Sequence, residues 1–142
     1  MRKFLFACLV LAGCTIPPLS PTLLSDANLA IAALQTLNTD ATLLGAPLAD
    51  TTAITIATGA IQTALTDMQN GIKTPQDFAT AVDDEVSQLA PTLLKDFKAN
   101  TTVTTGVVLL QQLVLLIGAE VTAPTTTAQA AVRQKMQNWV VK

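Results

Sequence analysis

The side chains best suited to acid–base or metal chemistry in this 142-residue chain are its ten carboxylates, and Asp83, Asp84 and Glu85 are consecutive. Carboxylate oxygens are the ligands that hard cations prefer, and paired carboxyl groups can hydrolyse glycosidic bonds. The surrounding sequence predicts a helix, on which consecutive side chains point about 100° apart. Three consecutive acids therefore cannot converge on one ion, and we expect them to form a solvated face opposite Phe78, Val82 and Val86.

Glu120 is the one acid that projects onto the apolar side of its expected helix, which makes it the strongest challenge to a non-catalytic interpretation. The rest of the composition argues against catalysis, because the chain has no His and its only cysteines are Cys8 and Cys14. Serine and cysteine triads and zinc sites of nitrogen and sulfur ligands cannot be assembled without them. No phosphate-binding loop of the form G-x-x-x-x-G-K-[ST] occurs. We therefore expect no catalytic, cofactor or metal site.

Basic residues are few and scattered along the chain. The formal net charge is −2, and without Arg2 and Lys3 six Lys and Arg remain against ten Asp and Glu. Binding to nucleic acid depends on clustered Lys and Arg that neutralise phosphates. We therefore do not expect a nucleic-acid partner.

The chain opens with a short basic and then apolar segment. Arg2 and Lys3 precede the nine-residue apolar run 4–12, and the small residue Gly13 follows it. This order is typical of a secretory signal peptide. The run is too short to cross a bilayer as a helix, which takes about 20 residues.

The four residues at the end of this run, Leu11-Ala12-Gly13-Cys14, resemble the lipobox of bacterial lipoproteins. The resemblance covers residues 1–14. It implies that residues 1–13 are a signal peptide, that a diacylglyceryl group is attached to the sulfur of Cys14, and that a fatty acid such as palmitate acylates the new amino terminus. It further implies a protein of the cell envelope that faces the periplasm or the exterior and is held to a membrane through the lipid on Cys14.

Residues 14–24 contain three prolines, Pro17, Pro18 and Pro21. Proline fixes φ and disfavours a helix in the residue before it, so this stretch should be extended and semi-rigid. We interpret it as a tether that holds a domain off the bilayer. The alternative is an irregular lead-in to the first helix.

Residues 25–142 predict an all-α domain. Ser25 and Asp26 can start a first helix that ends near residues 38–40, and Asn70-Gly71 can stop a second one whose apolar face holds Ile54, Ile61, Leu65, Met68 and Ile72. Thr74-Pro75-Gln76-Asp77 is the strongest start signal in the chain, because it combines an N-cap residue, a proline at the first helical position and an acid three places on. The apolar stripe that follows it is Phe78, Val82, Val86, Leu89, Leu93 and Phe97. Pro91 should kink or split this third helix.

A fourth segment, residues 102–121, is the most apolar part of the chain after the leader. Its polar residues, Gln111 and Gln112 among them, collect along one third of the helix circumference, which favours a core helix of a bundle over a helix that spans a bilayer. Thr126 and Gln129 can then form a capping box, and Val132, Met136, Trp139 and Val140 give the inner face of a last helix. No segment shows the alternation of a strand. The sequence therefore predicts an antiparallel bundle of four or five helices.

These features predict a non-enzymatic, lipid-anchored helical protein that works through contact with another envelope protein. Two alternatives remain at this point. A membrane-active protein of the lysis or exclusion type, a phage-encoded one included, would insert residues 102–121 in the bilayer. A carrier would bind a small apolar ligand between the helices.

Overall fold

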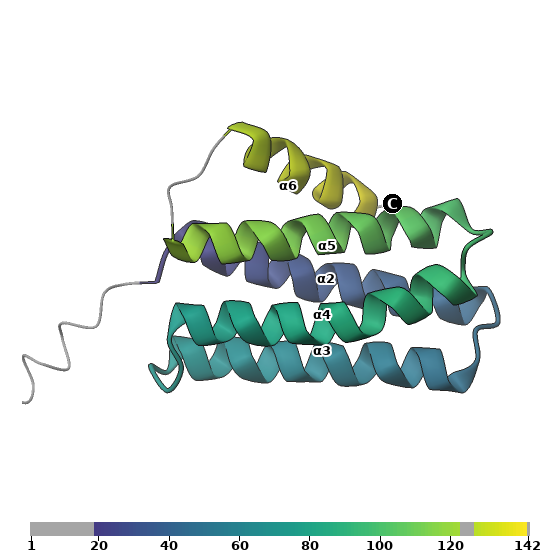
Figure 1. Cartoon of the computed structure of the whole chain (residues 1–142), viewed down its shortest axis with the longest axis horizontal. Helices are drawn as coiled ribbons and strands as arrows, with labels where there is room; N and C mark the ends of the chain where they lie inside the picture. The colour runs from purple at the N-terminus through teal and green to yellow at the C-terminus, as the bar shows by residue number, and fades with distance from the viewer. Residues whose placement is uncertain (1–18, 123–126, 142) are drawn as a thin grey trace, which may run out of the picture.

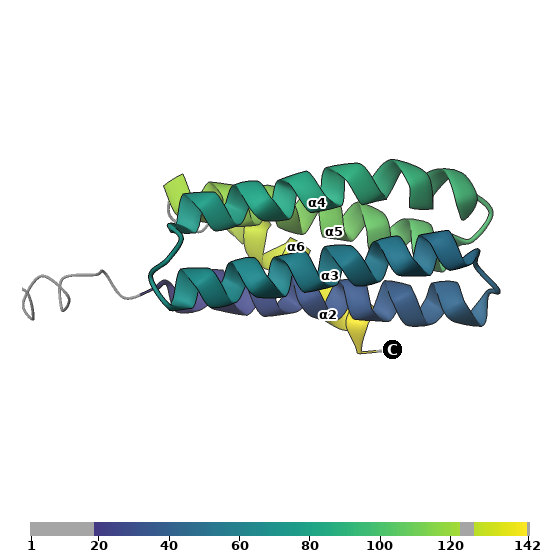
Figure 2. The same ribbon diagram turned by 90° about the horizontal axis from the view of Figure 1, so that it is seen from below.

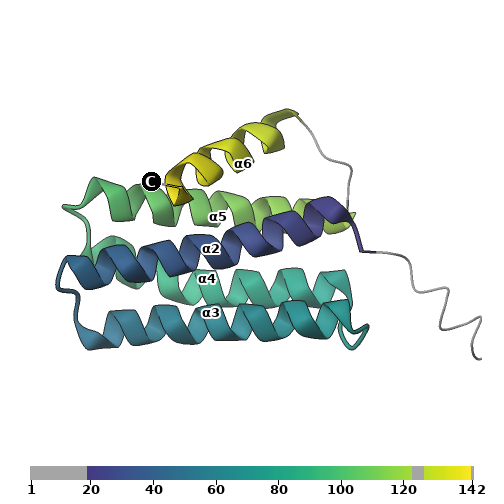
Figure 3. The same cartoon turned by 180° about the vertical axis from the view of Figure 1, so that it is seen from behind.

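The computed structural model describes residues 19–122 and 127–141 as helices joined by short loops. Within these residues there are five helices and no strand, namely α2 (Pro21–Leu43), α3 (Leu48–Gln69), α4 (Pro75–Asp96), α5 (Thr101–Thr122) and α6 (Thr127–Val140). Helices α2 to α5 run alternately in opposite directions, and α6 crosses obliquely over α5 and α2 (Figures 1 and 3). The expected antiparallel helical bundle is confirmed. The expected signal peptide, Cys14, residues 15–18 of the tether and Thr126 lie outside the described residues.

The first helix starts four residues earlier than the sequence predicted. It begins at Pro21 and not at Ser25, and the side chain of Ser20 accepts a hydrogen bond from the amide of Leu23 at 3.5 Å. Proline is favoured at the first position of a helix, where its missing N–H has no partner to lose. Residues 21–24, assigned to the tether from the sequence, therefore belong to α2, which also continues beyond the expected end to Leu43.

Two glycines with φ of +71° end α2 and α3 in the same way. After α3 the amide of Gly71 donates to the carbonyl of Met68 at 3.1 Å, and the amide of Ile72 donates to that of Asp67 at 2.8 Å, which is the Schellman pattern. The expected stop at Asn70-Gly71 is confirmed. The assignment of Ile72 to the apolar face of the helix is wrong, because the turn places it beyond the helix with 71% of its surface exposed.

Helix α4 starts as its sequence predicted. Thr74 and Asp77 form a reciprocal capping box, in which the amide of Asp77 donates to the Thr74 hydroxyl at 3.1 Å and the amide of Thr74 donates to the Asp77 carboxylate at 3.0 Å. Hydrogen bonds from the backbone and then the hydroxyl of Thr74 hold the pKa of Asp77 below its usual value. The helix continues through Pro91 and is not split. Pro91 and Ser87, whose carbonyl lies four residues back, are both exposed, so water can reach the carbonyl that the proline leaves without a partner.

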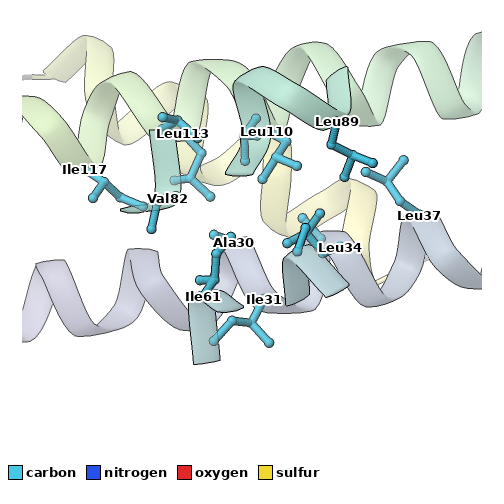
Figure 4. Close-up of a cluster of buried hydrophobic side chains, with 14 of the residues drawn as sticks. Ala30, Ile31, Leu34, Leu37, Ile61, Val82, Leu89, Leu110, Leu113 and Ile117 are labelled. Atoms are coloured by element: carbon cyan, nitrogen blue, oxygen red, sulfur yellow. The ribbon is translucent and has the colours of Figure 1, made fainter. Parts of the chain in front are cut away.

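Aliphatic side chains from all four long helices fill the core, as Figure 4 shows for Leu34, Ile61, Val82 and Leu113. The apolar stripe expected on α4 is buried along its whole length. Helix α5 lies between α4, α2 and α6, and its buried residues are Val103, Gly106, Val107, Leu109, Leu110, Leu113, Val114, Leu116 and Ile117. The lengthwise polar stripe of α5 is confirmed by the exposure of Gln111 and Gln112.

The buried apolar residues of the described part all lie between Leu23 and Trp139. A chain that starts at Thr15 therefore keeps the whole core, and we expect it to be soluble, mainly helical by circular dichroism and cooperative in thermal unfolding. A strand-dominated spectrum would contradict the bundle. A helical chain that dissolves only in detergent would contradict the assignment of α5 to the core.

The two ends of the bundle differ in what they carry. The tether end holds Leu19, the α3–α4 loop of residues 70–74 and the last residue of α5, Thr122 (Figures 1 and 2). The far end holds the α2–α3 loop of residues 44–47 and the α4–α5 loop of residues 97–100. Any attachment through residues before Leu19 therefore acts on the tether end.

Candidate functional site

The most polar buried feature of the described residues is a cluster of Asp26, Arg133 and Glu120. The Nε of Arg133 donates to both carboxylate oxygens of Asp26, at 2.7 Å and 2.9 Å, and its Nη2 donates to Oε1 of Glu120. The side chains of Asp26, Glu120 and Arg133 are 0%, 4% and 13% exposed. Glu120 is thus buried as its place on the apolar side of α5 suggested, and a cation from another helix accompanies it.

The Asp26–Arg133–Glu120 cluster fixes α6 on the bundle. Its three residues come from α2, α6 and α5, so one guanidinium joins three helices near the tether end. The hydrogen bonds to Asp26, together with the charges of Asp26 and Glu120, raise the pKa of Arg133 above its ordinary value, against the opposing effect of burial. A guanidinium with a raised pKa remains charged and does not exchange protons near neutral pH. The arrangement therefore supports a structural role for Arg133, which holds α6 against α2 and α5.

A second contact holds the other half of α6. The indole of Trp139 packs directly against Gly106 of α5, and its Nε1 donates to the carbonyl of Thr102 at 3.1 Å. Met136, one turn earlier, is fully buried. The expected packing role of Trp139 and Met136 on the inner face of the last helix is confirmed.

Gly106→Ala should loosen α6, because a Cβ at this position would overlap the six-membered ring of Trp139. The backbone of α5 cannot yield easily inside the bundle, so we expect the indole to move out and its fluorescence emission to shift to longer wavelength. The reporter is clean, since Trp139 is the only tryptophan of the chain. Gly118→Ala in the same helix is the matched control, because an added Cβ there meets nothing within 4 Å. Gly118→Ala should leave the emission of Trp139 unchanged and raise stability slightly, because alanine has a higher helix propensity than glycine. Equal emission spectra for both variants would contradict the Gly106–Trp139 contact.

Two carboxyl groups, one on α3 and one on α4, lie close to each other at the far end. Asp50 lies in the first turn of α3 and is buried, whereas Asp96, the last residue of α4, is exposed. Burial raises the pKa of Asp50 above its usual value, and the negative charge of Asp96 raises it further.

The raised pKa of Asp50 predicts a pH-dependent stability. The folded chain binds the proton of the Asp50 carboxyl more tightly than the unfolded chain does. The stabilisation that this proton gives is fully present at acid pH, and it is lost as the pH rises above about 3.8, the ordinary pKa of the group. Asp50→Asn, which is neutral at every pH, should therefore gain stability relative to the parent as the pH rises from 4 to 7. Urea unfolding at several pH values measures this difference, and Asp40→Asn on α2 serves as a control. A gap between Asp50→Asn and the parent that is constant across this range would contradict the assignment.

The consecutive acids of α4 lie mostly at the surface. Asp83 and Asp84 are exposed and Glu85 is half-buried, as expected for a solvated helix face. No group of three His, Cys, Asp or Glu side chains is placed to hold a metal ion within residues 19–122 and 127–141.

Two apolar surfaces stand out instead. At the far end Leu43, Leu44 and Leu48 are 80%, 50% and 80% exposed, beside a hollow of about 570 Å³ between the two loops. At the tether end a groove of about 680 Å³ runs between the start of α2 and the α3–α4 loop. The apolar residues that line it are Leu19, Leu24, Met68, Ile72 and Pro75.

Sequence reasoning missed the partnership of Arg133 with Asp26. It considered Asp26 only as part of a helix start. The available signal was spacing, because Arg133 precedes the inner-face residues Met136 and Val140 by three and seven positions.

Comparison of the chain with protein-family models, curated protein sequences and solved structures gives no match, so the function must be inferred from the residues themselves.

Proposed function

We propose that this chain is a lipid-anchored, non-enzymatic helical protein of the cell envelope that acts through contact with another envelope protein. The lipid would be attached at Cys14, on the strength of the resemblance of residues 11–14 to a lipobox. The fully buried core begins at Leu23 and only Leu19 among the described residues before it packs against that core, which leaves the segment before Leu19 available for export and anchoring.

The observation that carries the contact function is the apolar far end. Leu43 and Leu44 close α2 and Leu48 opens α3, so three large apolar side chains surround one short loop. The 23 residues of α2 separate this loop from the tether end by about 34 Å at 1.5 Å per residue. Exposed apolar surface that gathers in one place is typical of interaction sites. An anchored protein that carries such a surface at its far end presents it to other proteins of the envelope.

The buried charges support the non-enzymatic part of the proposal. Arg133 forms ion pairs with both Asp26 and Glu120 in the interior, and Asp50 lies near another carboxyl group at the opposite end of the bundle. The cluster of Asp26, Glu120 and Arg133 lies near the tether end, whereas Asp50 and Asp96 lie at the far end. The two groups of charges therefore do not combine in one site.

Site-specific photo-cross-linking in intact cells tests the contact. A photoreactive amino acid at position 48 should give a discrete cross-linked species, whereas the same group at the exposed position 55 of α3 should give none. Leu43→Ser with Leu44→Ser should weaken the species formed from position 48, and Cys14→Ser should abolish it because the chain is no longer held at the membrane. Cross-linking that is equal at positions 48 and 55, or that persists in full without Cys14, would contradict the proposal.

A second candidate function rests on α5. Residues Thr101–Thr122 are long and apolar enough to cross a membrane, although half of their most apolar 18-residue window is buried in the bundle. A membrane-active protein would release this helix into the bilayer. The core helix of a bundle passes the same test of length and composition, and the burial of α5 against three helices favours that explanation.

A further inference from the structure

We infer that the tether-end groove is a membrane-facing surface, whose apolar lining rests on the bilayer to which Cys14 is anchored. This inference depends on the lipid anchor of the proposed function and adds the orientation of the bundle. The groove is defined by Leu19, Leu24, Met68, Ile72 and Pro75, with a volume of about 680 Å³.

The length of chain before the groove limits where this end can be. Leu19 follows Cys14 by five residues, and an extended chain spans at most about 3.6 Å per residue. The groove therefore stays within about 18 Å of an acylated Cys14, whose lipid lies in the bilayer. The far end, about 34 Å further along α2, has no such constraint.

The loop that forms one wall of the groove is suited to an apolar environment. The Schellman turn directs Ile72 outward, and the amides of Gly71, Ile72 and Lys73 donate to the carbonyls of Met68, Asp67 and Asp67. The capping box satisfies the next amide, that of Thr74. Because these backbone donors are paired inside the protein, the turn can enter the edge of a bilayer without leaving them unsatisfied.

Among the described residues, the groove has no basic patch beside it. Lys73 Nζ lies 3.8 Å from a carboxylate oxygen of Asp67, and Asp77 follows in the capping box. A surface without an excess of positive charge gains little from anionic headgroups, so contact should depend on the apolar side chains. We therefore expect the orientation to be retained on zwitterionic lipid and at high salt, unlike that of a polybasic surface.

Position-specific quenching tests the orientation. The mature protein is purified with a single reactive thiol, since Cys8 leaves with the leader and the sulfur of Cys14 is in a thioether. Gln69→Cys at the tether end and Thr52→Cys at the start of the same helix are both exposed and lie about 26 Å apart along α3. Each is labelled with an environment-sensitive fluorophore and reconstituted in phosphatidylcholine vesicles that contain a nitroxide lipid.

We expect the label at position 69 to be quenched severalfold more strongly than the label at position 52. Adding Ile72→Ser should reduce the quenching at position 69 by about half, while Thr80→Ser, on the exposed side of α4, should not change it. Equal quenching at both positions on vesicle-bound protein, or stronger quenching at position 52, would overturn the orientation and leave the anchor intact. A chain that carries no lipid and does not float with the vesicles would overturn both. An emission of the fluorophore at position 69 that reports the same apolar environment without vesicles would not indicate membrane contact. That result would show that the groove holds a bound apolar molecule, and it would also overturn the inference.

Discussion

Replacing Arg133 with methionine is expected to lower the free energy of unfolding by about 3 to 5 kcal/mol, which is typical when one partner of a buried ion pair is removed. The reason is that two buried carboxylates, Asp26 and Glu120, lose the guanidinium that is bonded to both of them. Methionine keeps much of the apolar stem, so the loss reports charge more than packing. Urea unfolding of the chain that starts at Thr15 measures the effect.

Two comparisons make this result specific. Lys135→Met removes a cation from an exposed position of the same helix and should change stability by less than about 0.5 kcal/mol. The triple variant Asp26→Leu, Glu120→Leu, Arg133→Met should recover most of the loss, because apolar residues of similar volume often replace a buried ion cluster at little cost. Equal effects at positions 133 and 135 would contradict the buried cluster.

Truncation of Leu113 should be nearly as costly. This side chain is fully buried in α5, and we expect Leu113→Ala to lower stability by about 2 to 5 kcal/mol through lost burial and the cavity left behind. Leu115→Ala in the same helix is the matched control, since Leu115 is 71% exposed. It should change stability by less than about 0.5 kcal/mol.

The comparison between Leu113 and Leu115 also separates the two candidate functions. A helix packed in an aqueous bundle distinguishes sharply between its inner and outer faces. A helix that functions in the bilayer would contact lipid with both residues, and the two truncations would then have similar effects on membrane association. That result would favour the membrane-active alternative.

Much of the fold could be predicted from the sequence because its determinants are local. The capping residues Thr74 and Asp77, the stop at Asn70-Gly71 and the apolar stripe of α4 each depend on residues a few positions apart. Helical periodicity also identified the exposed Gln111 and Gln112 on the most apolar helix. Such signals give helix number and inner faces without knowledge of tertiary contacts.

The parts of the fold that could not be predicted have two causes. Some depend on contacts between residues far apart in the sequence, and others involve a residue type, such as proline, that occurs in two different local structures. Asp26 and Arg133 are 107 positions apart, and no local pattern pairs them. Pro21 looked like a continuation of the tether prolines, whereas proline at a helix start obeys the same restriction on φ. Ile72 fitted the apolar period of α3, but the glycine before it ends the helix and turns it outward. The groove at the tether end follows from this turn and from the approach of α2, and it has no sequence signal of its own.

The intact mass of the protein extracted from membranes tests the lipid anchor. We expect a chain of residues 14–142 that carries a diacylglyceryl group on Cys14 and an acyl group on its amino terminus, and we expect Cys14→Ser to abolish both the cleavage and the lipid. A membrane-associated chain that retains residues 1–13 and carries no lipid, and whose mass in Cys14→Ser differs only by the substitution, would contradict the lipid anchor.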